Sequence, residues 1–331
     1  MMQQLVNLVD QQWDVWAPRT PRPRETSFLL QSRNRVIVFV FARGARLPTF
    51  VAKIGRNHPD APRLRQEYDN LLYLRDRLGD LASTLPRPLY LGEVAGHPVM
   101  VETFLTGKVM LPTGPLCWRR NYSRDLQAML VWLKAFQTRT TVGYLRWDEA
   151  VLDAKARRRI DKAGRKAGVS RITVDYLNNL ANGLRDRQLP LVSAHGDLHH
   201  SNILLADGRV CGVTDWEFSS RASYPFFDWF QFLFEYNLEL SKKRRRGLSR
   251  EKLVVKAISG IFSPTSSLAN LARPRTEGLF ATYGLSDQLA PLFFTLYLLD
   301  FHWPGDRNWL LRSAFPLVAH PQNVYAGRTS K

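Results

Sequence analysis

The sequence predicts an α+β protein in two parts, a small β-rich amino-terminal part and a larger, mainly helical carboxy-terminal part. Two patterns lead to this prediction. Up to residue 105, stretches of β-branched and aromatic residues flank a single amphipathic helical pattern. After residue 105, apolar residues recur mostly at helical spacing. We therefore divide the chain into an amino-terminal arm at 1–24, a first lobe at 25–105 and a second lobe at 106–331.

The arm and the first lobe carry clear local patterns. After a short amphipathic stretch, three prolines among residues 18–23 predict an extended backbone. Residues 36–41 and 49–54 are rich in β-branched and aromatic side chains, which predicts an antiparallel pair of strands. Residues 63–78 space their apolar side chains three, four and seven apart, as in a helix. The apolar face of this helix is expected to comprise Leu64, Tyr68, Leu71, Leu72 and Leu78, with Arg75 in the remaining position. Two more short strands are expected at 89–91 and 98–103.

The second lobe is dominated by helical patterns. Between them, two short apolar runs, 203–205 and 210–213, are separated by Asp207 and Gly208. The Asp-Gly dipeptide accepts the positive φ angles of a tight turn, so these runs predict a β-hairpin. Helices are expected over residues 122–136, 148–166, 174–184, 226–240 and 292–301.

The composition excludes several classes of protein. Of the 331 residues, 45% are hydrophobic and 23% are charged, a balance typical of a folded globular chain rather than a disordered or collagen-like one. Cys117 and Cys211 are too few for a disulfide framework, so we expect a reducing, cytoplasmic compartment. The longest mainly apolar runs, 36–42 and 291–299, are much shorter than the roughly 20 residues that span a bilayer. The first 14 residues lack the basic start and apolar core of a secretory signal.

The net charge is strongly positive. Lys and Arg total 47 against 29 Asp and Glu, which gives a formal net charge of +18. Such an excess favours phosphate, anionic lipid or other acidic partners. By itself it does not choose between an enzyme and a binding module.

The pattern with the clearest chemistry runs from His195 to Asn202 and continues at Asp215. Asp197 lies in a loop, from which a carboxylate can reach a substrate hydroxyl. Asn202 precedes the first strand of the predicted hairpin and Asp215 follows the second, so an amide oxygen and a carboxylate are expected at one end of it. Oxygen ligands of this kind suit Mg²⁺. Phosphoryl transfer needs both a carboxylate that orients the nucleophile and a metal ion that screens the phosphoryl group.

These motifs resemble the aminoglycoside phosphotransferase and choline kinase branch of the protein-kinase-like superfamily, whose catalytic loop reads His-Gly-Asp with Asn five residues later. Its metal loop reads Asp-Trp/Phe-Glu. The resemblance covers about residues 28–234 and implies a two-lobed kinase-like fold that uses ATP or GTP with Mg²⁺. It implies Asp197 as the catalytic base, and Asn202 and Asp215 as catalytic residues that bind the metal. Two further residues would have supporting roles, His195 in the loop and Glu217 at the metal site.

The resemblance extends to a nucleotide site in the first lobe. It implies that Lys53, at the end of a strand, holds the α- and β-phosphates and pairs with Glu67 on the following helix. Residues 99–105 resemble the hinge between the lobes, where the backbone near Glu102 and Phe104 would meet the adenine.

Residues 31–35 occupy the place of the nucleotide loop but contain no glycine, although glycine lets backbone amides approach phosphate closely. Members of this branch often keep Ser and Asn here, which implies Ser32 and Asn34 as nucleotide-binding residues. We expect Arg33 or Arg35 to replace some of the amide contacts.

Other residues have simpler interpretations. Asp228, within a segment that resembles the family's brace, is expected to support the catalytic loop. His199 and His200 are adjacent, so their side chains point apart, and we assign them to loop packing rather than to a metal pair. Cys211 is expected to be a small core residue of the hairpin.

Two basic blocks stand apart from the motifs. Residues 155–166 contain seven Lys or Arg against one Asp, and residues 242–246 are all basic. Each block is equally well interpreted as a solvated helix face or loop. However, the first block falls between the hinge and the catalytic loop, where the family builds its acceptor site. A polycationic acceptor would call for carboxylates there, so the basic segment favours an anionic acceptor.

We therefore predict an ATP-dependent kinase that phosphorylates a hydroxyl of a sugar, glycan or glycolipid-like acceptor with anionic character. Contact with an anionic membrane surface through the basic blocks is compatible with this prediction. Two alternatives remain open. One is an antibiotic kinase of the aminoglycoside type. The other is an inactive kinase-fold protein that binds nucleic acid or anionic membrane, which the complete set of acidic catalytic positions disfavours.

Overall fold

The computed structural model divides into two compact units. Unit 1 comprises Met1–Val109 with Asn202–Ser220, and unit 2 comprises Met110–Ser201 with Arg221–Lys331. The hairpin region, which the sequence analysis assigned to the second lobe, therefore belongs to unit 1. The structure describes residues 2–18, 20–21, 35–42, 44–56, 60–112, 118–244, 247–301, 305–320, 323 and 325.

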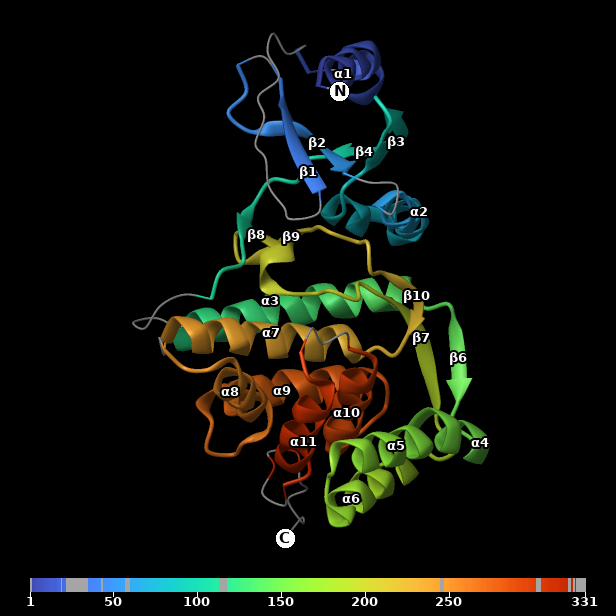
Figure 1. The fold of residues 1–331 in the computed structure, drawn as a ribbon, viewed down its shortest axis with the longest axis vertical. Helices are drawn as coiled ribbons and strands as arrows, with labels where there is room; N and C mark the ends of the chain where they lie inside the picture. The colour runs from blue at the N-terminus through green and yellow to red at the C-terminus, as the bar shows by residue number, and fades with distance from the viewer. Residues whose placement is uncertain are drawn as a thin grey trace. The chain divides into compact units, whose positions relative to one another are not determined.

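Unit 1 is the β-rich part (Figure 1). Its main sheet has four antiparallel strands in the order β1-β2-β4-β3, and a second sheet has the order β5-β8-β9. The strands are β1 (Arg35–Phe41), β2 (Pro48–Gly55), β3 (Pro88–Val94), β4 (His97–Thr103), β5 (Lys108–Val109), β8 (Ile203–Ala206) and β9 (Arg209–Val213). The helices are α1 (Met2–Trp16), α2 (Ala61–Leu78) and the 3-10 helix η2 (Gly79–Thr84).

Helix α1 is part of the unit 1 core rather than of a separate arm. Its buried side chains include Leu5, Val9 and Trp13, which belong to one hydrophobic cluster with residues of β1, β2 and β4. The Trp13 ring meets Phe50 of β2 edge to face, with ring centroids 5.1 Å apart. An amphipathic helix needs a surface on which to bury its apolar stripe, and α1 finds it on the main sheet. Of the stretch 18–23 predicted to be extended, residues 19, 22 and 23 lie outside the described residues.

Strand β2 of the main sheet is buried on both faces. Phe50, Ala52 and Ile54 of β2 belong to the cluster that contains α1. Because side chains alternate along a strand, Val51 and Lys53 lie on the opposite face. Helix α2 buries Leu64, Glu67, Asn70, Leu71, Leu74 and Leu78.

The predicted helix over 63–78 is confirmed, but one member of its apolar face is exposed and another, Tyr68, is only half-buried. Leu72 is 48% exposed. The buried side instead includes the polar residues Glu67 and Asn70, which the periodicity of apolar residues cannot reveal. The predicted hairpin is also confirmed. Its turn residues Asp207 and Gly208 have φ angles of +51° and +74°.

Unit 2 is mainly helical (Figure 1). It contains α3 (Trp118–Arg139), α4 (Glu149–Leu152), a π-helical turn η3 (Asp153–Arg157), α5 (Arg158–Ala167), α6 (Arg171–Asn182), α7 (Phe227–Arg244), α8 (Arg250–Phe262), α9 (Ser267–Thr282), the 3-10 turn η5 (Asp287–Leu289), α10 (Ala290–Asp300) and α11 (Arg307–Val318). Strands β6 (Gly143–Arg146), β7 (Gln188–Ala194) and β10 (Ser220–Ser223) form a sheet in the order β10-β7-β6, and the short 3-10 turn η4 (His200–Asn202) follows β7 along the chain.

Aromatic packing holds the core of unit 2 together. Phe226 stacks on Phe280 of α9 with ring centroids 4.0 Å apart and also contacts Phe293 of α10. Helices α3 and α7 lie side by side, joined by a Tyr122–Tyr236 ring contact (Figure 1). This core fixes the start of α7, whose residues Asp228 and Gln231 contact the loop around Asp197.

No helix in the described part of the chain combines the length and hydropathy that a bilayer span requires. Helix α10 is strongly apolar, but it has 11 residues and its side chains are buried inside unit 2. Its apolar character therefore reflects burial in the protein core.

Candidate active site

The predicted site residues fall into two groups, one in each unit. In unit 2, the predicted catalytic loop, residues 195–201, begins where β7 ends. Gly196 has a φ angle of +79°, which glycine adopts without strain. The carboxylate of Asp228, buried at the start of α7, accepts hydrogen bonds from the N–H groups of His195 (2.7 Å) and Gly196 (3.1 Å). His195 is fully buried, and its Nδ1 accepts a hydrogen bond from the N–H of Asp197 (3.2 Å). The loop backbone is therefore held from two sides.

Asp197 is also held through its carboxylate. Its Oδ1 accepts a hydrogen bond from Nε2 of Gln231 (3.1 Å), and its Oδ2 lies 3.4 Å from Nε2 of His199. Burial alone would raise the pKa of Asp197, but His199, together with His195 and Gln231, lowers it below its ordinary value. The result is an ionised carboxylate in a fixed orientation, as a group that receives a hydroxyl proton requires.

The sequence analysis did not identify Gln231. It lies three residues after Asp228 on α7, so both side chains face the same side of the helix. Once Asp228 is assigned to the loop, this helical spacing is the signal that points to Gln231.

In unit 1, Lys53 of β2 and Glu67 of α2 form the predicted pair. Lys53 Nζ lies 2.5 Å from Glu67 Oε1, and both residues are buried. Burial alone would lower the pKa of Lys53, but the carboxylates of Glu102, Glu67 and Asp215 raise it above its ordinary value. Lys53 is therefore a permanently charged ammonium, suited to bind phosphate.

Glu102 is a second carboxylate partner of Lys53. The distance from Lys53 Nζ to Glu102 Oε1 is 3.0 Å. The sequence analysis assigned Glu102 only through its backbone, since a single glutamate in a strand pattern does not reveal a buried ion pair. The N–H of Phe104 donates a hydrogen bond to the carbonyl of Thr49 (3.0 Å), so this donor is used within the unit, and the Phe104 ring meets Phe39 edge to face.

The hairpin of unit 1 carries the two expected metal ligands. Asn202 is buried, and its carbonyl accepts a hydrogen bond from the N–H of Thr214 (2.9 Å). The next residue, Asp215, has a φ angle of +69°, in the left-handed region that non-glycine residues rarely occupy. The N–H of Trp216 then donates to Glu67 Oε1 (3.1 Å). One glutamate thus connects the lysine of β2 with the loop that carries Asp215.

Asn70, which the sequence analysis missed, fixes the same loop. Its side-chain amide donates to the carbonyls of Trp216 (3.3 Å) and Ser219 (3.2 Å). It is buried three residues after Glu67 on α2, so both lie on the side of the helix that faces this loop.

The donor set suits a hard cation. Among the described residues, no three or more His, Cys, Asp or Glu side chains gather into a metal-binding cluster. Mg²⁺ commonly takes only one or two carboxylates from the protein and completes its shell with water and phosphate oxygens. The Asn202 amide and the Asp215 carboxylate, at one end of the hairpin, fit that requirement.

Glu217 pairs with Arg35 at the start of β1. Burial raises the pKa of the half-buried Glu217 carboxyl, and Arg35 opposes this rise. Arg35 thus contacts a carboxylate, although the sequence analysis considered it as a phosphate ligand. Residues 31–34, which include the expected nucleotide-binding residues Ser32 and Asn34, lie outside the described residues.

The side chains of the two adjacent histidines do not point apart as predicted, because their rings meet edge to face with centroids 6.0 Å apart. His199 lies beside Asp197, and its Nδ1 is 2.7 Å from the Ser201 hydroxyl. The ring of His200 meets Tyr236, and burial lowers the pKa of His200 to about 4. Cys211 is half-buried in β9, where burial raises the pKa of its thiol.

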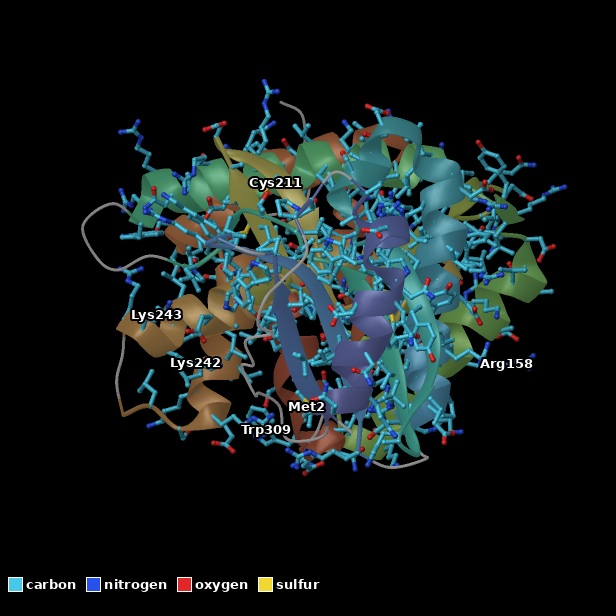
Figure 2. The ribbon with its side chains drawn as sticks, turned by 90° about the horizontal axis from the view of Figure 1, so that it is seen from above. Met2, Arg158, Cys211, Lys242, Lys243 and Trp309 are labelled. Atoms are coloured by element: carbon cyan, nitrogen blue, oxygen red, sulfur yellow. The ribbon has the colours of Figure 1, made fainter. Side chains whose placement is uncertain are left out.

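Part of the first basic block is paired within unit 2. Arg158 points outward from the molecule in Figure 2 and forms an ion pair with Asp153. Arg157 and Arg159 are also paired, with Glu149 and Asp300. Three of the seven cations of the block therefore have their charge offset within unit 2.

Part of this block lines a cavity of about 600 Å³ in unit 2. Lys155 and Arg159 contribute to its wall, together with Asp300 and the aromatic rings of Tyr224 and Phe227. Phe227 directly precedes Asp228, so the cavity wall and the brace of the catalytic loop share the first turn of α7.

The second basic block ends α7. Lys242 and Lys243 both lie within 4 Å of Glu239, and Lys243 Nζ also donates to the carbonyl of Pro112 (3.1 Å). Arg244 covers the ring of Trp118, with its guanidinium carbon 4.4 Å from the ring centroid. Arg245 and Arg246 lie outside the described residues.

Comparison with known proteins assigns the family. The model of the phosphotransferase enzyme family matches residues 31–238, more than half of the chain. The chain belongs to the phosphotransferase enzyme family. This membership confirms the predicted resemblance, the kinase-like fold and the activity of a phosphotransferase that acts on a hydroxyl group.

Solved structures similar to this phosphotransferase are distant in sequence. A macrolide 2′-phosphotransferase from Brachybacterium faecium is 16% identical, with 96% of this chain and 98% of that chain covered and a TM-score of 0.44. An aminoglycoside phosphotransferase from Streptomyces rimosus is 13% identical, with 95% and 98% covered and a TM-score of 0.45. One from Alicyclobacillus acidocaldarius is 12% identical, with 91% and 90% covered and a TM-score of 0.46. No curated protein sequence matches the phosphotransferase.

Proposed function

We propose that this phosphotransferase moves the γ-phosphoryl group of ATP to a hydroxyl of a small molecule that carries an anionic group, such as a sugar phosphate or an acidic glycan. The proposal rests on the environment of Asp197. Its carboxylate is fixed by Gln231 and kept ionised beside His199. Such a carboxylate can orient a hydroxyl and receive its proton.

In the proposed mechanism, unit 1 binds the nucleotide. The Lys53 ammonium neutralises charge on the α- and β-phosphates, and Glu67 holds Lys53 in place. The amide oxygen of Asn202 and the carboxylate of Asp215 would hold Mg²⁺, which supplies charge screening for the phosphates. Since Glu67 also accepts the N–H of Trp216, one buried side chain holds both the lysine and the loop that carries Asp215.

Unit 2 prepares the acceptor. Asp197 accepts a hydrogen bond from the acceptor hydroxyl and directs the oxygen toward the γ-phosphorus atom. It takes up the hydroxyl proton as the new P–O bond forms and the bond from the γ-phosphorus to the bridging oxygen breaks, so that ADP leaves with that oxygen. Asp228 keeps the loop backbone in position during this step through its two hydrogen bonds to the loop.

The cavity beside α5 supports the choice of acceptor. Its charged lining residues are Lys155, Arg159 and Asp300, and the ion pair between the last two leaves Lys155 as the surplus charge. Aromatic Tyr224 and Phe227 offer apolar surface for a sugar ring. A cavity of about 600 Å³ with one surplus cation favours a small acceptor with an anionic group over a polycation.

A coupled assay of ADP release tests the proposal across sugar phosphates, acidic glycans, neutral sugars, aminoglycosides and amino alcohols. We expect turnover with at least one anionic acceptor. The Lys155→Gln variant should raise KM for that acceptor about tenfold, the loss of one interaction of roughly 1.4 kcal/mol, with little change in KM for ATP. Lys162→Gln is the matched control, because Lys162 is an exposed lysine outside the cavity wall. Turnover confined to polycationic aminoglycosides would refute the acceptor class.

A further inference from the structure

The sheet of unit 1 places Lys53 and Glu102 on one face. In the antiparallel pairing of β2 with β4, Lys53 is opposite Met100 and Val51 is opposite Glu102. Lys53 and Val51 point the same way, so the side chain of Glu102 is a diagonal neighbour of Lys53. The same face receives Glu67 from α2. Strand register and helix packing therefore gather one ammonium and two carboxylates at this point.

The charge balance of this cluster, with two carboxylates around one ammonium, is unusual for a buried site. Lys53, Glu67 and Glu102 are 7%, 0% and 3% exposed, and the lysine donates to both carboxylates, at 2.5 and 3.0 Å. Within the described part of the chain, Oε2 of Glu102 is buried and accepts no hydrogen bond. A buried, partly unpaired carboxylate is costly to keep ionised.

The charges that face Glu102 come from three elements. Lys53 on β2 attracts it, and Glu67 on α2 and Asp215 after β9 repel it. Burial is the largest influence and raises the pKa of Glu102 to about 7, against the attraction of Lys53. The Glu102 carboxylate can therefore gain or lose its proton near neutral pH when the charges around Lys53 change.

We propose that Glu102 is a positioning residue that holds Lys53 in the nucleotide-free enzyme and takes up one proton from solvent when nucleotide phosphate binds to Lys53. The inference rests on the proposed function, since it requires phosphate at Lys53. Phosphate that binds to Nζ either displaces Glu102 or shares the ammonium with it. In both cases a new negative charge comes close to a buried carboxylate, and its neutral form is favoured.

The consequence is a linkage between pH and nucleotide affinity. Bound phosphate raises the affinity of Glu102 for its proton. Nucleotide binding therefore takes up protons at every pH at which Glu102 is ionised in the free enzyme. As pH rises from about 7, the Kd for nucleotide should therefore increase, by up to about tenfold per pH unit. Well below this pH Glu102 is already neutral, and the dependence should disappear.

Isothermal titration calorimetry on the full chain tests this linkage. Titration of ADP with Mg²⁺ at pH 8, in two buffers with different ionisation enthalpies, gives the number of protons taken up. We expect the wild type to take up close to one proton more than Glu102→Gln. Glu93→Gln, which removes an exposed carboxylate from the neighbouring strand β3, should behave as the wild type. Protonation of the nucleotide itself is common to all three proteins and cancels in the comparison.

A second measurement needs no variant. Adenosine lacks phosphate and should bind the wild type without proton uptake, with a Kd that does not change with pH. The absence of any binding of ADP would refute the proposed function. If ADP binds with the same proton uptake as adenosine, or if the wild type and Glu102→Gln take up the same number of protons, the role of Glu102 is refuted while the proposed function stands.

Discussion

The hold of Asp228 on the catalytic loop can be measured through the variant Asp228→Asn. The carboxylate accepts one hydrogen bond with each oxygen, from the N–H groups of His195 and Gly196. An asparagine has the same shape but only one oxygen, so one of these N–H groups would face the amide NH₂. This substitution therefore removes one half of the brace without leaving a cavity.

The size of the effect follows from the burial of the site. A buried N–H without an acceptor costs about 1–3 kcal/mol. Burial raises the pKa of Asp228, so loss of its charge recovers part of the desolvation cost. We therefore expect the free energy of unfolding to fall by about 1–2 kcal/mol. Displacement of the loop by a fraction of an ångström to 1 Å should lower kcat by about 10- to 100-fold.

Denaturant unfolding and ADP-release kinetics on the same preparations test both effects. Asp175→Asn is the matched control, a half-exposed aspartate on α6 whose i,i+4 ion pair with Arg171 should be worth less than about 0.5 kcal/mol. If Asp228→Asn matches the wild type in stability and kcat, Asp228 does not brace the loop. If stability falls and kcat is unchanged, the two hydrogen bonds serve the fold alone.

Two other substitutions separate chemistry from stability. Asp197→Asn should abolish phosphoryl transfer because an amide cannot accept the hydroxyl proton, whereas calorimetry should show nearly unchanged nucleotide binding, since the nucleotide residues lie in unit 1. Undiminished turnover would remove Asp197 from the mechanism. Trp13→Ala should lower the free energy of unfolding by about 3–5 kcal/mol, because its ring is fully buried against the main sheet. Val15→Ala on the exposed side of α1 should change it by less than about 0.5 kcal/mol, and equal effects would contradict the assigned packing.

The sequence predicted those parts of the site that depend on short stretches of chain. The loop around Asp197 and the hairpin after Asn202 are local structures, and the Asp-Gly turn has the positive φ angles that its sequence demands. The pairing of Lys53 with Glu67 was predicted through the family resemblance, since a strand lysine and a helix glutamate carry no mark of their contact.

Contacts between distant segments were not predictable. Helix α1 was assigned to an arm, because its amphipathic pattern does not say which surface will cover it. The ion pairs of the first basic block were also missed. Arg159 pairs with Asp300, 141 residues away, and a count of charges along the chain cannot reveal such a partner.

The charges around Lys53 explain why nucleotide binding would need both a divalent cation and a proton on Glu102. Among the described side chains of this cluster, the cations Lys53 and Arg35 face four carboxylates, those of Glu67, Glu102, Glu217 and Asp215. A polyphosphate adds further negative charge to a region that already has an excess of it. Lys53 alone cannot offset that excess, because its charge is already shared between two carboxylates. Nucleotide binding therefore requires that positive charge arrive with the ligand, as a divalent cation at Asn202 and Asp215 and as a proton on Glu102.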